Sequence, residues 1–399
     1  MKFWLLILLL PGVVLARDDP WDDDAWDDDW GEDEAAFVWS GFLEAGLGSR
    51  FSADDRIDNR NTLEDLRARV ETEWAPDDYS LTLKADVGYD GIEDEWFGDF
   101  RDLSLKFRLG DNTDVSFGRQ VHTWGTGDLV FLNDLFPKDF VSFFAGRDDE
   151  YLKAPANTLR ITRYSSAVNV DFVWTPIFEP DVYLTGERFS FWSPLAGEIV
   201  APDPPLRAVD PDEKLGNGEY AVRLFRTIKG SEYAIYGYRG FTKQPGALTD
   251  DLWPTFARLT AAGASVRRPL GPGLVNSEFS YHDADDDQWR FLAGYEWEAK
   301  TNFSVGLQYY LESGPDEDRH VLTNRLTYRA GMDKYTWSLF TFWSPDDADY
   351  YLRPQFTYRH SDRWSMTAGG NLFGGNDDYT FFGQLQDGSN AYLRVRFNY

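Results

Sequence analysis

The sequence predicts an all-β protein, a transmembrane antiparallel up-and-down β-barrel of about 18 strands. Three observations support this. Apolar and polar side chains alternate over stretches of ten-odd residues from Phe37 to the end of the chain, as on strands with two different faces. Aromatic residues stand at both ends of the apolar faces. The connections alternate between short turns and longer loops, as in bacterial barrels with short periplasmic turns and long extracellular loops.

The N-terminus has the features of a signal peptide over residues 1–16. Lys2 precedes an apolar run from Phe3 to Leu15, and the small residue Ala16 closes it. An uncleaved membrane anchor is the alternative, but a spanning helix needs roughly 20 apolar residues, more than this run provides. We therefore expect export and cleavage before Arg17.

Residues 17–36 are expected to form a disordered periplasmic tail. Acidic residues surround Trp21, Trp26 and Trp30 without a period that could bury one face. Two interpretations stay open: a solvated tail, or a short linear motif in which the tryptophans dock on a basic periplasmic partner or the acids collect a cation.

The barrel itself is expected over residues 37–399. In the segment YSLTLKADVGY, alternate positions from Tyr79 to Tyr89 are apolar and the face begins and ends in Tyr. This is typical of a lipid-facing strand with a ring at each membrane interface. The segments 289–297 and 335–343 repeat the pattern. A soluble β-sandwich, the competing interpretation, would need a core on this face but no aromatic residues at its two ends.

The strand starts are read from the same alternation. They fall near Phe37, Leu63, Tyr79, Phe100, Thr113, Thr158, Val168, Glu219, Glu232, Phe256, Gly273, Gln288, Asn302, His320, Lys334, Tyr350, Arg363 and Asn390. An even number of strands places both chain ends on the periplasmic side. Turns such as Gly110-Asp111-Asn112 and Lys229-Gly230 are then periplasmic, and acidic loops such as HDADDDQ are extracellular.

The faces opposite the apolar ones would line the lumen. They carry a set of cations, namely Arg67, Arg69, Lys106, Arg108, Arg160, Arg223, Arg325, Arg353, Arg359, Arg394 and Arg396. Rings of Arg or Lys select for anions. Alternatively, lumen carboxylates such as Asp65, Asp86 and Glu296 pair with these cations and only brace the wall. A single bulge would reverse the assignment within a strand.

Two loops are too long for simple connections at the rim. The first spans residues 121–157 and is expected to pack against the inner wall as a constriction, with Lys138, Arg147, Asp148, Asp149, Glu150 and Lys153 at the narrowest point. The second, over residues 176–217, is Pro-rich and is expected to form a lid or an external platform. Either loop could instead be a surface feature without gating.

Some motifs resemble known proteins. A strand ending in Gly-Arg-Gln (118–120), the pair Trp124-Gly125 and the segment from Leu152 to Pro155 resemble porin-like outer-membrane proteins, and the layout is similar to 18-stranded substrate-selective channels, including the alginate-export type. Phe397 and the terminal Tyr399 look like the C-terminal signal read by the barrel assembly machinery. The resemblance implies a channel and leaves the substrate open.

Chemistry other than transport has little support in the sequence. There is no Gly-x-Ser-x-Gly nucleophile elbow, and among the four His residues only His122 or His282 offers a candidate for an outer-leaflet enzyme. We expect His282, His320 and His360 near extracellular strand ends. We expect no cofactor, no metal site and no nucleic-acid partner. The outward faces look uniformly apolar, which favours a monomer surrounded by outer-membrane lipid.

The sequence therefore predicts a porin-like channel of the bacterial outer membrane, without enzymatic activity. Small solutes, anionic if the basic lumen governs selection, would cross passively. The alternative is a component of an export or surface-assembly system whose acidic tail binds a periplasmic partner.

Overall fold

A computed structural model describes residues 38–76, 78–315 and 318–399. The expected signal peptide and acidic tail lie outside the described residues. Within these three segments, no helix is long and apolar enough to cross a membrane.

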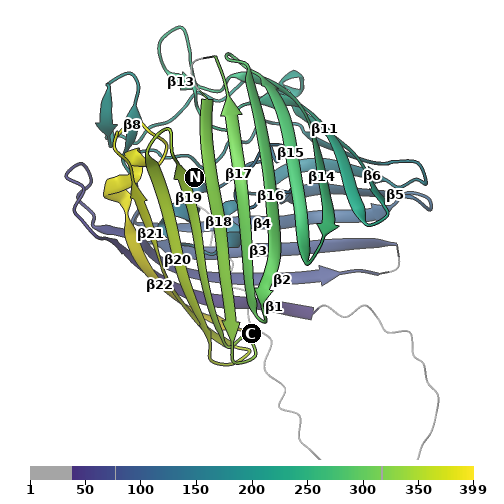
Figure 1. Ribbon diagram of the computed structural model, residues 1–399, viewed down its shortest axis with the longest axis horizontal. Coiled ribbons are helices and arrows are strands. Elements are labelled where there is room, and N and C mark those ends of the chain that lie inside the picture. The colour runs from purple at the N-terminus through teal and green to yellow at the C-terminus, as the bar shows by residue number, and fades with distance from the viewer. Residues whose placement is uncertain (1–37, 77, 316–317) are drawn as a thin grey trace, which may run out of the picture. The chain divides into compact units, whose positions relative to one another are not determined.

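The described chain forms one closed sheet of 18 antiparallel strands (Figure 1). The strands are β1 (Val38–Arg50), β2 (Asn61–Trp74), β3 (Tyr79–Asp90), β4 (Glu95–Arg108), β5 (Thr113–Gln120), β6 (Ala156–Arg163), β7 (Asn169–Thr175), β10 (Glu219–Ile228), β11 (Ser231–Phe241), β14 (Arg258–Leu270), β15 (Gly273–Asp283), β16 (Gln288–Lys300), β17 (Phe303–Ser313), β18 (Asp318–Ala330), β19 (Tyr335–Ser344), β20 (Asp349–Arg359), β21 (Trp364–Gly374) and β22 (Asn390–Asn398). Each pairs with the next along this series, and β22 returns to β1. The predicted barrel and its strand number are confirmed.

The remaining elements are short and lie in loops. They are the helix α1 (Phe140–Ala145), the 3₁₀ turns η1 (Asp149–Leu152), η2 (Leu215–Asn217) and η3 (Gly383–Gly388), and two small hairpins, β8 (Phe191–Ser193) with β9 (Glu198–Val200) and β12 (Ala247–Leu248) with β13 (Pro254–Thr255). The long loops and short turns alternate as predicted. One sequence assignment was wrong: His360 follows β20 in a short turn, at the periplasmic rim.

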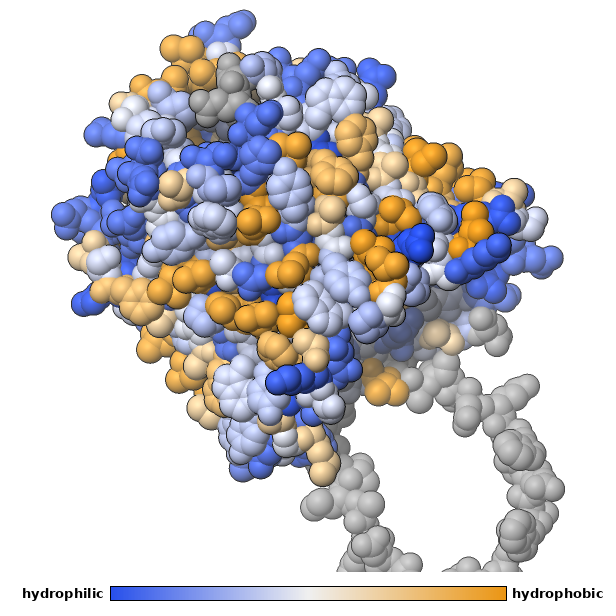
Figure 2. All heavy atoms as spheres, viewed as in Figure 1, coloured by the Kyte–Doolittle hydropathy of each residue, from blue (hydrophilic) through white to orange (hydrophobic). Residues whose placement is uncertain are grey.

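The outer wall carries the predicted aromatic faces. Tyr79, Trp337 and Trp343 are each more than two-fifths exposed, and each lies within three residues of an end of its strand, β3 or β19. Tyr335 stacks on Tyr358 across β19 and β20 with 5.4 Å between ring centroids. Figure 2 shows apolar side chains spread over the strands on the face in view. Such a surface is stable in lipid and would be unstable in water.

The prediction of a uniformly apolar outer face was wrong in one sector. Strand parity directs six arginines of the described strands outward, and all of them lie on β5, β6, β10, β11 or β14; they are Arg119, Arg163, Arg226, Arg239, Arg258 and Arg268. They stand toward the two ends of their strands, and apolar residues such as Val222 and Ile235 lie between them. Arginine is tolerated on a lipid-facing wall at the interfaces, where its head reaches water or headgroups.

The barrel closes where the last residue meets the first strands. The backbone N–H of Tyr399 donates to the carbonyl of Gly41 over 3.1 Å, and its hydroxyl donates to the carbonyl of Arg69 over 2.7 Å. The hydroxyl passes Gly41 to reach β2, and a Cβ at Gly41 would collide with the Arg69 carbonyl. Phe397 lies on the outer face against Trp364, 4.9 Å between centroids. Recognition of Phe397 and Tyr399 by the assembly machinery stays a prediction.

We expect Tyr399→Phe to lower the free energy of unfolding by about 1 kcal/mol, because the hydrogen bond to the Arg69 carbonyl is lost while the ring stays. Urea unfolding of the refolded protein in detergent measures this difference. Tyr350→Phe, at an exposed position on the outer wall, is the control and should change little. Equal stability of the Tyr399→Phe variant and the unsubstituted protein would contradict the role of this hydroxyl.

Candidate functional site

The candidate site is built by the loop of residues 121–155, between β5 and β6, which enters the barrel. Its first half is held by β15. Glu278, which is 2% exposed, accepts hydrogen bonds from the backbone N–H groups of Thr126 and Gly127 and from the Asn133 side chain. Further along, Asp128 pairs with Arg325 of β18 over 2.5 Å. These contacts attach the loop to the wall opposite its own strands.

The second half of the loop crosses to β1–β3 and β20–β22. Arg147 pairs with Asp65 and with Asp90, each at 2.6 Å. Asp149 accepts from Arg353 of β20 over 2.5 Å, and Asp148 lies 3.0 Å from Arg394 of β22. The loop is thus anchored around most of the circumference.

The densest of these contacts surrounds Arg69, whose side chain is 1% exposed. Its guanidinium donates to Asp86 at 2.6 and 2.8 Å, to Glu150 at 2.5 Å and to the Tyr151 hydroxyl at 2.7 Å. The Tyr151 hydroxyl in turn donates to Asp86 over 2.7 Å. Every charge in this group has a hydrogen-bonded partner, as burial requires.

The sequence of the loop explains its local shape. Asp139 caps α1 by accepting from the N–H of Ser142, and Gly146 ends the helix with φ 91°. Asp148 then caps η1 by accepting from the N–H of Glu150. A Cβ at Gly146 would collide with the ring of Tyr392. The two caps direct Arg147, Asp148 and Asp149 toward the wall.

Apolar side chains fill the extracellular half of the interior around this loop. Phe143, Phe144 and Leu152 pack with Tyr351 and Phe373, inward residues of β20 and β21. Phe144 and Phe373 meet edge to face, with 5.3 Å between centroids. Apolar contacts therefore fill the space between this loop and β20–β21, while charged pairs such as Arg290 with Glu312, at 3.1 Å, lie on the inner wall at the extracellular ends of β16 and β17.

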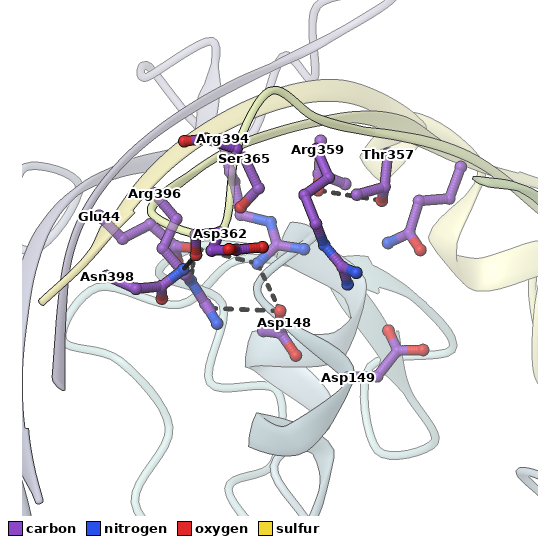
Figure 3. A pocket seen from close by; sticks show the side chains of 13 residues that line it. Glu44, Asp148, Asp149, Thr357, Arg359, Asp362, Ser365, Arg394, Arg396 and Asn398 are labelled. Atoms are coloured by element: carbon purple, nitrogen blue, oxygen red, sulfur yellow. Dashed lines mark hydrogen bonds and ion pairs between the residues drawn. The ribbon is translucent and has the colours of Figure 1, made fainter. Parts of the chain in front are cut away.

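A cavity of about 340 Å³ with a mostly polar lining lies on the periplasmic side of the loop (Figure 3). Its lining includes Arg359, Arg394 and Arg396 with Glu44, Asp148, Asp149, Gln355, Thr357, Ser361, Asp362, Ser365, Thr367 and Asn398. Arg394 and Arg396 both pair with Glu44 and Asp148, at 2.8 to 3.3 Å. Burial alone would raise the pKa of Asp148, but the two guanidinium groups hold that pKa below its usual range.

Arg359 differs from its neighbours in this cavity. It is exposed, and within the described part of the chain its guanidinium has no ion pair and no hydrogen bond. Figure 3 shows it extending into the cavity toward the loop. A second cavity of about 310 Å³ lies across the lumen, lined by Thr126, Asp128, Arg267, Glu296, Arg325 and their neighbours.

The other predicted lumen cations lie on inward faces and mostly have partners. Arg67 contacts Asp86 at 3.1 Å, Arg160 contacts Asp171 at 2.6 Å, Arg223 pairs with Glu232, and Arg108 pairs with Asp114 at 3.0 Å. For Lys106, as for Arg359, the described residues offer no ion pair. The mixed lumen that the sequence analysis left open as an alternative describes this arrangement better than a bare ring of cations.

Of the six predicted constriction residues, Asp148 and Asp149 line the 340 Å³ cavity. Glu150 and Arg147 bind Arg69 and Asp65 of the wall, and the two lysines lie inside the loop. Lys138 is 3% exposed, and its ammonium group donates to the Asp134 carboxylate at 3.0 Å and to the carbonyl of Phe136 at 2.6 Å. Lys153 also pairs with Asp134, at 3.0 Å. Both lysines bind Asp134 in the interior of the folded loop. They therefore do not line the periplasmic-side cavity. Burial lowers the pKa of Lys138.

Sequence reasoning missed Arg101, Glu278 and Arg188. Arg101 donates to the carbonyls of Glu150 and Lys153, at 2.9 and 2.7 Å. A register shift between β3 and β4 turns both Arg101 and Asp102 inward, and two adjacent polar residues between Phe100 and Leu103 were the available signal. The other two depend on loops folding back, which no local pattern reveals.

The loop of residues 176–218 covers the same interior from the extracellular side. Arg188, 2% exposed in its side chain, pairs with Asp90 and lies 3.1 Å from Glu93. Phe189 joins the apolar cluster around Phe144. An apolar cavity of about 970 Å³ opens between this loop, the loop of residues 242–257, α1 and η3.

Comparison with solved structures supports the fold. Acinetobacter baumannii OccAB3 is 11% identical with a TM-score of 0.57, over 92% of this chain and 99% of that one. OccAB4 of the same species is 12% identical with a TM-score of 0.55, over 92% and 99%. Pseudomonas aeruginosa OccK2, solved in complex with glucuronate, is 10% identical with a TM-score of 0.55, over 91% and 97%. These are outer-membrane porins. No protein-family model and no curated protein matches the chain.

We expect Asp86→Asn to lower the free energy of unfolding by about 3–5 kcal/mol, because Arg69 would stay buried without its main counterion. Asp114→Asn is the matched control: its partner Arg108 is 65% exposed in its side chain, and a surface pair contributes about 0–1 kcal/mol. Denaturant unfolding of both refolded variants measures the difference. Similar losses of unfolding free energy in the two variants would show that the ion pairs around Arg69 contribute no more to stability than a surface ion pair.

The packing of the loop should weaken in acid through His122. The pKa of His122 is lowered to about 4 mainly by burial and also by the nearby Arg160, while Asp171 and Asp134 act in the opposite direction. An opened loop would return this pKa to its ordinary value near 6.5, so the opened state binds the proton first. The packed state is favoured fully above pH 6.5 and loses up to about 3 kcal/mol as the pH falls to 4.

Hydrogen exchange at the amides of residues 121–136, corrected for intrinsic rates, should therefore show more frequent opening at pH 4.5 than at pH 7. His122→Gln should remove most of this pH dependence. A His122→Gln variant with the same dependence as the unsubstituted protein would assign the effect to other groups.

Proposed function

We propose that this outer-membrane barrel is a passive channel for small anionic solutes, with the loop of residues 121–155 as its constriction. Arg359, Arg394 and Arg396, which line the 340 Å³ cavity, would contact the solute. The observation that carries the proposal is the exposed guanidinium of Arg359 beside two further arginines in a cavity with a mostly polar lining. A guanidinium fork matches a carboxylate in geometry and charge.

Most other lumen cations would have a different role. Arg69 is paired with Asp86 and Glu150, and Arg353 is paired with Asp149. These two arginines therefore hold the loop in place and have little charge left to attract a passing ion. Selection would then rest on a few groups at the periplasmic side of the constriction. This is narrower than the rings of cations that the sequence suggests.

The likeness to other channels agrees with this cargo class. The OccK2 crystal contains glucuronate, an acidic sugar, and that chain shares the fold of this one. A solute would first meet the apolar cavity under the extracellular loops and then the polar cavity beyond α1. Catalysis at the outer leaflet has little geometric basis, because His282 is 4% exposed and its Nε2 is hydrogen-bonded at 3.1 Å to the carbonyl of Leu132 inside the barrel.

The test is the zero-current potential of the refolded mature protein in a planar bilayer under a KCl gradient. We expect anion preference, and Arg359→Gln should reduce the ratio of chloride to potassium permeability by about twofold to tenfold, because it removes the cavity cation that has no partner among the described residues. Arg329→Gln, an exposed inward position of β18 outside both cavities, is the matched control and should change the ratio less.

Cation preference in the unsubstituted protein would contradict the proposed selectivity and assign control to the acidic loops. Equal effects of Arg359→Gln and Arg329→Gln would contradict a local site and favour a general lumen potential. Absence of conductance would contradict the open channel itself.

A further inference from the structure

The outer wall carries a basic hollow that the channel does not use. It is lined by Gly216, Gly218, Tyr220, Arg239, Gly240, Arg258, Leu259 and Thr260, and its volume is about 570 Å³. Tyr220, Arg239 and Thr260 stand side by side on β10, β11 and β14, where Tyr220 pairs with Arg239 and Arg239 pairs with Thr260. These side chains share the lipid-facing parity of Val222 and Ile235.

Two arginines converge on this hollow. Arg258 lies one diagonal step from Arg239, since its cross-strand partner is Phe241, two residues beyond Arg239. Its guanidinium packs over the Phe241 ring at 4.1 Å from the centroid and donates to the Asn217 side chain over 2.5 Å. Arg239 is exposed, and its guanidinium has no hydrogen bond or ion pair among the described residues. The hollow therefore offers donors that the protein does not satisfy.

The position of the hollow fixes the level at which a ligand would bind. Arg239 lies near the extracellular end of β11 and Arg258 at the extracellular end of β14, so both stand at the outer membrane interface. Farther down the same strands the wall is apolar through Leu224 and Ala264. An anion bound here would have its charge at the interface and any attached chain along this apolar surface.

We propose that Arg239 and Arg258 bind the phosphate group of an outer-leaflet lipid. Paired guanidinium groups bind phosphate oxygens strongly and with defined geometry. The source of the phosphate follows from position. Arg239 and Arg258 lie on the lipid-facing wall at the outer interface, where the acyl chains of a lipid hold its headgroup beside them. Gly216, where an added Cβ would meet nothing within 4 Å, leaves room for the sugar or glycerol part of a headgroup.

The sector around the hollow agrees with this inference. The six outward arginines all lie between β5 and β14. Arg119, the remaining one at the extracellular rim, is already paired with Glu179 over 2.8 Å. Arg239 and Arg258 are thus the outward arginines at this rim that face open space without a carboxylate. Arg226 and Arg268 lie on the same strands toward the periplasmic rim and provide an internal comparison.

The test is lipid retention by the detergent-solubilised barrel, measured by native mass spectrometry with lipid A that carries both phosphates and with lipid A from which both have been removed. We expect the phosphorylated lipid to bind at least about tenfold more tightly than the dephosphorylated one. The double variant Arg239→Gln with Arg258→Gln should lose this preference, and Arg226→Gln with Arg268→Gln should keep it. The planar-bilayer conductance of the first double variant should be unchanged, because both residues face away from the lumen.

Three results would overturn the proposal. Equal retention of both lipids would show that phosphate is not recognised. If both double variants lost the preference for the phosphorylated lipid equally, the preference would depend on the total charge of the protein and not on Arg239 and Arg258. Competition by millimolar inorganic phosphate at full strength would identify a site for the free ion instead of a lipid.

Discussion

The structure depends on the charge pairing between the inner wall and the loop of residues 121–155. Arg69 exemplifies it: a guanidinium with 1% of its side chain exposed is stable only because Asp86, Glu150 and Tyr151 complete its hydrogen bonds. Removing water from these charges is costly, and the cost is offset only when every donor and acceptor finds a partner. Wall and loop both supply charges of each sign: Arg353 and Arg394 of the strands bind Asp149 and Asp148 of the loop, and Arg147 of the loop binds Asp65 and Asp90 of the strands. Neither part is therefore satisfied alone. The loop can therefore occupy a lumen that would otherwise be a wide water-filled space.

The same pairing decides which groups remain for a solute. An inventory of lumen arginines overstates the positive field, because most of these charges are neutralised at 2.5 to 3.3 Å by carboxylates of the wall or the loop. What remains is local: Arg359 stands without an ion pair among the described residues in one cavity, beside the paired Arg394 and Arg396, and Arg267 stands in the same way beside the paired Arg325 in the other. A channel built in this way would select by a few placed donors, and its loop would respond to pH through the carboxylates and through His122.

The composition of the outer surface is set by a different constraint, contact with lipid. Lipid tolerates charge only near its interfaces, so outward arginines stand at the strand ends and apolar residues fill the middle. Their confinement to the sector from β5 to β14 makes the wall asymmetric around the barrel. One side presents mainly aromatic residues to the membrane, and the other presents guanidinium groups at both interfaces. The hollow at Arg239 and Arg258 lies in this second sector.

The sequence by itself determined the barrel, its 18 strands, the direction of each face and the two classes of connection, because strand alternation and turn residues are local properties of the chain. It also identified the loop at residues 121–157 as too long for a rim. Only the tertiary structure decided which charges meet. Lys138 lies buried beside Asp134, Glu278 anchors a loop some 150 residues away in the chain, and a bulge turns Arg101 inward. These outcomes depend on how the loop folds across the lumen, and the energy of a charge pair depends on a distance between residues that no local pattern encodes.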